Sequence, residues 1–275
     1  MTRGGTRQLA NTPERLRARL AANRGASADF DRFVLDLLAP SPGDAALDLG
    51  PGTGKQLLPL AGRVARIVGV DRCPRMVAAL APHVRAPGAR VVQADMDELA
   101  GLDLAGGFSL VYAVYSLYYS ADPARVVEAV ASLLQGARAR FVVVTPDVGN
   151  NARWHADLGR LFDVPPDVLE VAGLCREVIL PALRDAFPTV TCATHRSDVR
   201  FASLDALMRY YDGCAPYCRP DRRAEARAYF AAAFERDGEY VIAKRSLGLV
   251  GRPDALSCAD GLPAAAPHLA ADARP

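Results

Sequence analysis

Residues 45–55 carry an acidic side chain and three glycines at a spacing that suits ligand binding. Asp48 lies in an otherwise apolar run, and Gly50, Gly52 and Gly54 follow it at every second position. Short apolar runs of this kind are typical of central parallel strands. Glycines leave no Cβ in the way of a ligand and permit positive φ angles. The pattern predicts a buried strand, then a glycine turn on which a small molecule could lie.

Three ligand-binding motifs begin with such a strand and turn. A phosphate-binding P-loop needs G-x-x-x-x-G-K-[ST], but Leu49 stands five residues before Gly54 and Gln56 follows Lys55. A dinucleotide-binding turn needs a small third residue where Lys55 stands. The pattern G-x-G-x-G, with an acid two residues before the first glycine, fits at every position. A helix predicted over residues 54–62 would point its N–H groups at the turn, which suits a ligand with an anionic group.

Acidic residues also stand at the ends of the next two predicted strands. Residues 66–70 lead into Asp71, and residues 90–94 lead into Asp95. An acid about 20 residues beyond the glycine turn, at a strand end, can accept hydrogen bonds from both hydroxyls of a ribose. Because the carboxyl ends of parallel strands meet at one edge of a sheet, we expect Asp48, Asp71 and Asp95 to face one ligand site.

Strands and helices alternate over residues 45–145. A fourth strand is predicted at 108–114, and Asp122 followed by proline marks the start of a helix over residues 123–134. A fifth strand is predicted at 139–145. This alternation requires a parallel sheet with right-handed crossover connections.

The motif and the strand ends together resemble the class I (Rossmann-like) S-adenosylmethionine (SAM) methyltransferase family, of the small-molecule type, from about Ala45 to Thr145. The resemblance implies an α/β fold with a seven-stranded, mostly parallel Rossmann-like sheet, helices on both faces and an antiparallel last strand. It implies SAM as cofactor and transfer of its methyl group to an O, N or C acceptor on a small molecule, such as a specialised metabolite. The cofactor-binding residues that it implies are Asp48, Gly50, Gly52, Gly54, Asp71, Arg72, Met76, Asp95, Met96 and Ala113.

Helices are predicted on both sides of the alternating region. Thr12 and the following proline predict the start of one N-terminal helix, and residues 27–38 form a second amphipathic one. The resemblance implies that residues 1–40 form a lid over a methyltransferase domain at 41–250. Two inserts, 146–172 and 203–236, would form a substrate lid, and a helix over 173–187 would be kinked at Pro181. Strands are predicted at 189–201 and 238–249, and residues 251–275 are predicted to be a disordered tail.

Polar and aromatic residues follow the fourth and fifth strands, where the family places the methyl acceptor. His155 is the candidate general base because its side chain is neutral near physiological pH, and Tyr115 is the second catalytic candidate. His195 has lower priority because it lies inside a predicted strand. Each of these residues also has a structural interpretation, as core or turn. The candidate substrate-binding residues are Tyr118, Tyr119, Asn150, Asn151 and Trp154.

The amino-acid composition and sequence argue against several classes of binding partner. The net charge of +2 and the absence of an amino-methyltransferase motif after the fourth strand argue against nucleic acid as the acceptor. No apolar run reaches the length of a membrane span, so we expect a cytoplasmic protein without membrane contact. Cys214 and Cys218 lack further ligands nearby, so no metal site is predicted. A protein or tRNA methyltransferase, a SAM-binding protein that transfers no methyl group, and a homodimer stay open.

Overall fold

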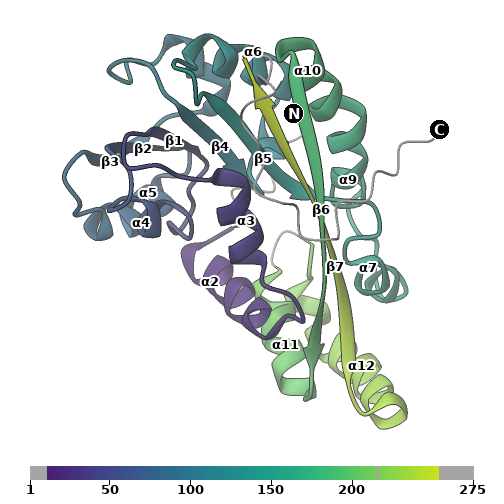
Figure 1. Ribbon diagram of the computed structural model, residues 1–275. Coiled ribbons are helices and arrows are strands. Elements are labelled where there is room, and N and C mark those ends of the chain that lie inside the picture. The colour runs from purple at the N-terminus through teal and green to yellow at the C-terminus, as the bar shows by residue number, and fades with distance from the viewer. Residues whose placement is uncertain (1–10, 215–216, 254–275) are drawn as a thin grey trace.

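The computed structural model describes residues 11–214 and 217–253. A sheet of seven strands runs through them in the order β3-β2-β1-β4-β5-β7-β6 (Figure 1). The strands are β1 (Ala45–Leu49), β2 (Arg66–Asp71), β3 (Ala89–Gln93), β4 (Leu110–Val114), β5 (Arg140–Pro146), β6 (Thr189–Phe201) and β7 (Tyr240–Arg252). Strands β1 to β5 are parallel, whereas β7 is antiparallel to both β5 and β6. The predicted fold is confirmed.

The helices connect and cover these strands. They are α2 (Pro13–Ala22), α3 (Phe30–Leu38), α4 (Leu57–Leu60), α5 (Pro74–Leu80), α6 (Pro123–Leu133), α7 (Ala152–Gly159), α8 (Pro166–Leu169), α9 (Val171–Leu174), α10 (Leu180–Ala186), α11 (Leu204–Gly213) and α12 (Arg223–Asp237). Two helices begin at the caps that the sequence predicts. The side chain of Thr12 accepts a hydrogen bond from the backbone N–H of Arg15, and that of Asp122 accepts one from Arg125.

Two predicted helices are shorter than expected. The helix predicted over 54–62 is reduced to α4, because Gly52 and Gly54 have φ angles of 56° and 84° that a right-handed helix excludes. The helix predicted from residue 27 begins later, at Phe30, because the side chain of Asp29 accepts from the backbone of the first turn. The glycine turn is therefore an open loop rather than the first turn of a helix.

The C-terminal prediction differs from the structure at two points. The kink predicted at Pro181 takes the form of a π-helical turn, Cys175–Ile179, between α9 and α10. A proline lacks the N–H that would continue the helical hydrogen bonds, and a wider turn before it relieves that mismatch. Strand β7 continues to Arg252, so the predicted tail begins later than residue 251. From residue 254 on, that tail lies outside the described residues. The composition of residues 1–12 predicts disorder, and residues 1–10 of that segment also lie outside the described residues.

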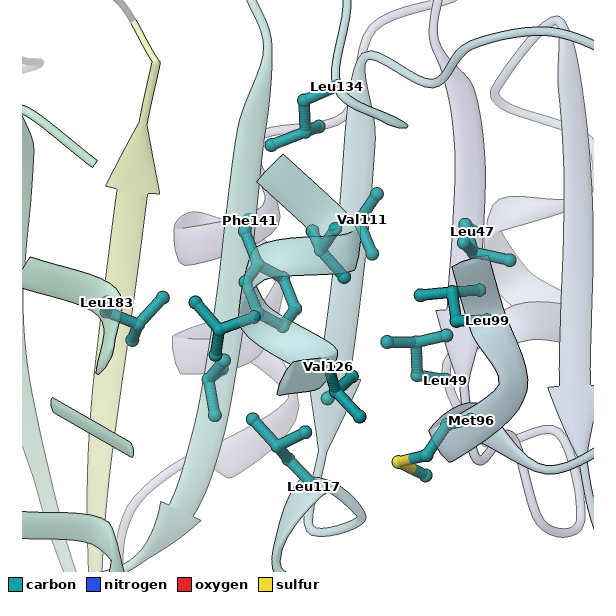
Figure 2. Close-up of a cluster of buried hydrophobic side chains, with 14 of the residues drawn as sticks. Leu47, Leu49, Met96, Leu99, Val111, Leu117, Val126, Leu134, Phe141 and Leu183 are labelled. Atoms are coloured by element: carbon teal, nitrogen blue, oxygen red, sulfur yellow. The ribbon is translucent and has the colours of Figure 1, made fainter. Parts of the chain in front are cut away.

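The side chains of successive residues in the central strands point to opposite faces of the sheet and are buried on both. On one face, Leu47 and Val111 pack with α6 and α10, and Figure 2 shows their side chains beside Val126. On the other face, Ala46 and Leu110 pack with α3 and α4. Because both faces are covered, the central strands are mostly apolar, as central parallel strands usually are.

The β6–β7 hairpin extends past the end of the sheet core. Pairing between β5 and β7 ends at Pro146 and Ser246, and β7 residues before Ser246 pair only with β6 in the described structure. Figure 1 shows this extension reaching α11 and α12. It is covered by a second set of apolar side chains, here called the outer cluster: Trp154, Leu158, Phe162, Val199, Phe201, Leu207, Met208, Tyr210, Tyr211, Cys214, Cys218, Ala226, Phe230, Ala233, Tyr240 and Ile242.

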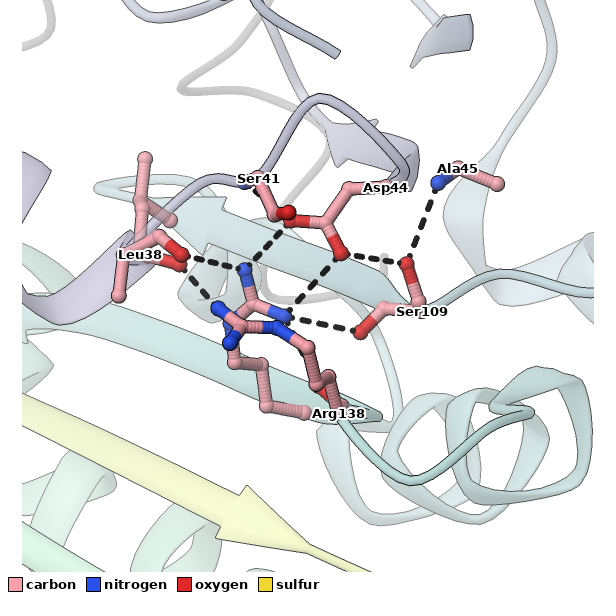
Figure 3. A network of polar contacts seen from close by, with 8 residues as sticks. Leu38, Ser41, Asp44, Ala45, Ser109 and Arg138 are labelled. Carbon is pink, nitrogen blue, oxygen red and sulfur yellow. Dashed lines mark hydrogen bonds and ion pairs between the residues drawn. The ribbon is translucent and has the colours of Figure 1, made fainter. Parts of the chain in front are cut away.

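A buried ion pair joins α3 to the sheet (Figure 3). The guanidinium of Arg140, only 1% exposed, donates to a carboxylate oxygen of Asp44 at 2.8 Å and to the carbonyls of Leu38 and Ala39 at 2.9 Å. The hydroxyl of Ser109 donates to the other carboxylate oxygen of Asp44 at 2.6 Å. These bonds hold the C-terminal end of α3 against β1 and β5, while Phe30 at its other end reaches the site described next.

The described residues contain no helix that is both long and apolar enough to cross a membrane. Over the same parts of the chain, no group of three or more His, Cys, Asp or Glu side chains is arranged to hold a metal ion.

Candidate active site

A cavity of about 1560 Å³ lies at the carboxyl ends of the parallel strands, enclosed by residues of α2, α3, α7, α11 and the extended hairpin. Ligand pockets usually have volumes of about 300–1,000 Å³, so this space admits two small molecules side by side. Strand β1 lies between β2 and β4, where the strand order reverses, and open α/β sheets bind ligands at this switch. The predicted site residues that line the cavity are Asp48, Gly50, Gly52, Asp71, Met76, Met96, Tyr115, Tyr118, Tyr119, Asn150, Asn151 and His155.

The glycine turn forms one wall of this cavity. Gly50 has a φ of 81°, and a Cβ added to it would lie 2.6 Å from the Cβ of Ser116, so no other residue fits there. The third glycine, Gly54, does not line the cavity. A Cβ on Gly54 would lie 2.4 Å from the side chain of Leu80. The missing side chain of Gly54 therefore allows Leu80 to pack closely against the turn. The expectation that Gly54 touches the ligand is therefore replaced by a packing role.

Asp71 ties the glycine turn to the end of β2. Its side chain is 5% exposed, and its two oxygens accept hydrogen bonds from the backbone N–H groups of Gly52, at 3.0 Å, and Cys73, at 2.9 Å. A carboxylate has about four lone-pair positions, so acceptor capacity remains for ligand hydroxyls. Burial raises the pKa of Asp71.

Asp48 is a second buried carboxyl group facing the cavity. It is 3% exposed, and burial raises its pKa to about 8, with a smaller contribution from the charge of Asp71. A carboxyl group with this pKa is largely protonated at neutral pH and ionises when a positive charge approaches. A cationic ligand at this strand end would therefore be stabilised by the ionised carboxylate of Asp48.

Three further predicted cofactor residues, Arg72, Asp95 and Ala113, do not line the cavity. Asp95 caps the 3-10 turn η3 (Met96–Gly101) through the backbone N–H of Asp97, at 3.1 Å, and forms an ion pair with Arg72 at 3.3 Å. Its neighbour Met96 does line the cavity. Ala113 is fully buried in the core, and the following residue, Val114, takes the position at the cavity wall.

Trp154 does not line the cavity either, so the prediction that it contacts the substrate does not fit the structure. It is fully buried in the outer cluster and stacks on Phe230 with ring centroids 5.2 Å apart. Helical geometry explains the difference. Ala152, His155 and Ala156 share the face of α7 that is turned to the cavity, whereas Trp154 and Leu158 share a different face, packed in the outer cluster.

Tyr115 lies at the end of β4 in a left-handed conformation, with a φ of 56°. Its hydroxyl is 2.8 Å from the hydroxyl of Ser246 on β7, and its ring packs edge-on against Phe30. Burial raises the pKa of Tyr115 to about 12. The hydroxyl therefore stays protonated near neutral pH, which suits orienting a ligand rather than removing a proton from it.

The two candidate histidines lie at different places in the cavity wall. His155 packs edge-on against the ring of Tyr217 at 5.6 Å, and burial, with the charge of Lys244, lowers its pKa to about 4. His195 packs between Phe30 and Phe33, and burial lowers its pKa as well. Both side chains are neutral at physiological pH and can accept a proton.

Several cavity residues escaped the sequence analysis because they come from distant segments. These residues are Arg19 on α2, Tyr210 on α11, Lys244 on β7, and Tyr217, which follows α11, and all of them line the cavity. One signal was available, since the chain has only two lysines and Lys244 is the one inside a predicted strand. No signal in the sequence pointed to Arg19, which is one of many arginines.

Residues 46–136, which hold the glycine turn and the strand ends, match a protein family described as a methyltransferase domain. This match and the observed fold support a class I methyltransferase domain in this part of the chain. Its methyl donor is S-adenosylmethionine. The site fits this cofactor, because Gly50 and Gly52 line the cavity with backbone alone, and Asp48 and Asp71 present carboxyl oxygens to a molecule with ammonium, sulfonium and ribose groups.

Curated relatives share part of the chain. It is 34% identical over 137 residues to the 23S rRNA (uracil(1939)-C(5))-methyltransferase RlmD of Chromohalobacter salexigens, which covers 42% of this chain and 29% of that protein. It is 27% identical over 187 residues to the ribosomal RNA small subunit methyltransferase A of Aromatoleum aromaticum, covering 61% of this chain and 70% of that protein. The methyltransferase domain thus spans less than a third of the first relative's length.

Solved structures share the fold at low sequence identity. A protein of Anabaena variabilis, described as a methyltransferase from an antibiotic biosynthesis pathway, covers 79% of this chain with a TM-score of 0.57 and 14% identity, over 94% of its own length. The YcgJ protein of Bacillus subtilis covers 80% of this chain, over 96% of its own length, with a TM-score of 0.52 and 14% identity. The [4+2]-cyclase SpnF covers 81%, over 80% of its length, with a TM-score of 0.50 and 18% identity.

Replacing Asp71 by alanine is expected to weaken SAM binding by about 1.5–3 kcal/mol, because charge-assisted hydrogen bonds to the ligand are lost. Titration calorimetry on the variant measures the change. Asp185, exposed on α10 away from the cavity, provides a control, and Asp185→Ala should bind SAM as the unmodified protein does. Unchanged affinity in Asp71→Ala would place the cofactor elsewhere.

The affinity for SAM is expected to rise with pH because of Asp48. The carboxyl group has a pKa of about 8, and the positive charges of SAM favour its ionised form. Affinity should increase by up to about tenfold per pH unit between about pH 6 and 7.5, with release of a proton. Calorimetry in buffers of different ionisation enthalpy measures both effects.

The Asp48→Asn variant is the matching control for this pH dependence. Its affinity should be lower and nearly independent of pH. Because the folded protein raises the pKa of Asp48, ionisation costs stability as pH rises toward 8, and the amide removes this cost. The variant should therefore be at least as stable at pH 7, so that weak binding is not a result of unfolding. Equal pH slopes in both proteins would contradict the assignment.

Proposed function

We propose that the protein transfers the methyl group of SAM to an oxygen, nitrogen or carbon atom of a small molecule, such as a specialised metabolite. The observation that carries this proposal is the single cavity of about 1560 Å³, in which the cofactor residues and a second group of polar residues share one space. The second group consists of Tyr118, Tyr119, Asn150, Asn151 and His155. An acceptor enclosed there would lie beside the cofactor and away from bulk water.

SAM supplies an electrophilic methyl group, so the protein needs mainly to position the acceptor and to exclude water. Tyr115 suits the positioning role, since its hydroxyl is held by Ser246 and stays protonated. Asn151 is oriented by a hydrogen bond from the ammonium of Lys244 to its carbonyl oxygen at 2.9 Å. His155, neutral at physiological pH, serves as the proton acceptor in this proposal.

The enclosing elements are consistent with a lid. Residues from α2 and α3, within the segment 1–40, line the cavity together with α7 from the insert 146–172 and α11 from the insert 203–236. Under the proposal these elements close over the acceptor. The domain at 41–250, the cytoplasmic location and a homodimer remain predictions.

The main alternative is a nucleic-acid or protein acceptor. The curated relatives are ribosomal RNA methyltransferases by name. Binding to RNA relies on basic groups that reach the phosphates, whereas the net charge here is only +2 and the cations Arg19 and Lys244 lie inside the cavity. These features favour a small acceptor over a large one.

The second alternative is a SAM-binding protein that transfers no methyl group. The likeness to the cyclase SpnF shows that a protein described by another reaction shares this fold. A site of this kind would bind the cofactor as strongly, because the residues around the glycine turn would be unchanged. Binding measurements alone therefore do not separate it from a methyltransferase.

Calorimetric titration with SAM, with S-adenosylhomocysteine and with NAD is the first test. Micromolar binding of the first two and no binding of NAD would support the cofactor site. Incubation with methyl-labelled SAM, once with a metabolite extract and once with ribosomal RNA, then tests the acceptor. Label transferred to small molecules is the expected result. Label only in RNA would favour the nucleic-acid alternative, and label in neither would favour a SAM-binding protein.

A further inference from the structure

Five Lys and Arg side chains line the cavity in the described structure. Two of them, Arg19 and Lys244, come from opposite ends of the sequence and lie on the proposed acceptor side, where Lys244 contacts Asn151. They lie close enough for the charge of Arg19 to contribute to the lowered pKa of Lys244, which burial brings to about 8. Like charges repel, so bringing them together in a partly buried site costs free energy unless an anion lies between them or beside them.

Lys244 is held by neutral groups. Its ammonium donates to the amide oxygen of Asn151 at 2.9 Å and to the hydroxyl of Tyr210 at 2.8 Å, and it lies 4.9 Å from the centre of the Tyr210 ring. An ammonium group has three N–H donors, and two of them are used here. Because the residue also lines the cavity, the third can serve a ligand.

A hydrogen bond to Asn11 and the packing of α2 on α11 hold Arg19 in place. Its guanidinium donates to the amide oxygen of Asn11 at 3.0 Å, and its side chain runs between α2 and α11. A Cβ on Gly213 would lie 3.1 Å from the Cγ of Arg19 and 3.2 Å from the carbonyl oxygen of Arg15. The glycine therefore allows the two helices to approach closely enough for Arg19 to reach the cavity.

Carboxylates do not balance this pair. Within the described residues, neither Arg19 nor Lys244 forms an ion pair with Asp or Glu. The cavity carboxylates lie elsewhere: Asp48 and Asp71 at the strand ends, and Asp29 and Asp31 at the exposed start of α3, where Asp31 pairs with Lys55 at 2.6 Å.

The thiol of Cys214 can offset part of the positive charge of Arg19 and Lys244. Burial would raise the pKa of Cys214, but the hydrogen bond from Cys218 and the charges of Arg19 and Lys244 lower it to about 6. Cys214 is fully buried behind the cavity wall. Even an ionised thiol leaves two positive charges against one negative charge, so the acceptor side stays positive toward the cavity.

We propose that the methyl acceptor carries a carboxylate, which Arg19 and Lys244 bind together. This inference depends on the proposed function, since it names the chemical class of that acceptor. The guanidinium and the third N–H of the ammonium supply charged donors from two sides, and the rings of Tyr118, Tyr119 and Tyr217 offer apolar surface for the rest of the molecule. A single carboxylate would offset the repulsion between the two cations.

The test uses three acids and their uncharged amides as probes: benzoate and benzamide, 3-phenylpropanoate and 3-phenylpropanamide, and hexanoate and hexanamide. Each is titrated into the full-length protein by nuclear magnetic resonance, with and without S-adenosylhomocysteine. At least one acid should bind at least about tenfold more tightly than its amide, since an ionised partner adds one to two powers of ten in affinity.

Variants locate the binding site. Lys244→Met and Arg19→Met keep the side-chain length and should each lower acid affinity at least about tenfold, without changing amide affinity. Lys244→Arg should retain most of the acid affinity. Arg209, exposed on α11 and outside the cavity lining, is the matched control, and Arg209→Met should leave all affinities unchanged.

Four outcomes would overturn the inference. The first is that no acid binds more tightly than its amide, and the second is that such a preference survives both methionine variants. The third is that phenyl phosphate, titrated as a further probe, binds more tightly than the acids and depends on Lys244, and the fourth is a tenfold loss of S-adenosylhomocysteine affinity in Lys244→Met or Arg19→Met. The last would assign the cations to the carboxylate of the cofactor itself. If the unmodified protein does not bind S-adenosylhomocysteine, the proposed function is refuted instead. The titrations that contain S-adenosylhomocysteine measure this binding directly.

Discussion

Replacing His155 by alanine is expected to lower kcat by about 10²–10⁴-fold, the usual contribution of a positioned general base. The affinity for SAM should not change, because His155 belongs to α7 and not to the glycine turn or the strand ends that are predicted to bind the cofactor. The measurement is steady-state kinetics with the acceptor found by the labelling experiment, together with calorimetry of SAM binding.

The pH profile gives an independent check on His155. A base must be unprotonated, and burial, with the charge of Lys244, lowers the pKa of His155 to about 4. At saturating SAM, kcat/KM for the acceptor should therefore stay level from about pH 7 to 5 and fall only below that range. An acceptor that neutralises Lys244 would remove the second cause of the shift, so the limb in kcat should lie at higher pH than the limb in kcat/KM.

His83 provides the matched control for this experiment, since it is exposed and outside the cavity lining. The His83→Ala variant should keep the kinetics of the unmodified enzyme. If His155→Ala turns over at the original rate, His155 is not the base, and the same experiment on His195 becomes the next step.

Replacing Asp44 by alanine is expected to lower the free energy of unfolding by about 3–5 kcal/mol, because Arg140 would be left buried without its partner. Arg140 and Asp44 are 1% and 2% exposed. Urea unfolding followed by circular dichroism measures the change. Asp163, which is exposed, is the control, and Asp163→Ala should have little effect.

The pH dependence of this loss follows from the pKa of Asp44. Burial alone would raise that pKa, but hydrogen bonds from Arg140, Ser109 and the backbone of Ser41 hold it below the usual range. A lowered folded-state pKa contributes stability above the unfolded value, near pH 4, and the contribution disappears as pH falls through the folded value. The difference between Asp44→Ala and the unmodified protein should therefore shrink below about pH 4.

The double variant Asp44→Ala/Arg140→Leu separates the ion pair from the space it fills. With both charges removed, no unpaired buried charge remains, so the double variant should lose less stability than the sum of the single variants. Additive losses would show that packing, rather than the ion pair, joins α3 to the sheet.

The sequence by itself determined the sheet and the cavity-lining residues at the glycine turn and the first two strand ends. Their signals are local: a glycine with positive φ, an apolar strand, and an acid at its end, as at Gly50 and Asp71. Chain connectivity then places these strand ends together, because parallel strands with crossover helices present all their carboxyl ends at one edge. The burial of Asp48 that raises its pKa follows from the same rule.

The tertiary structure decided which residues outside the strand ends face the cavity. Trp154 and His155 are neighbours in the sequence, yet only His155 lines the cavity, because the orientation of α7 follows from its packing on the outer cluster. Arg19 and Lys244 are separated by most of the chain and meet only through the packing of α2 on α11 and the extension of β7 beyond the sheet. Contacts of this kind depend on helix packing over long sequence separations, which no local pattern of residue types encodes.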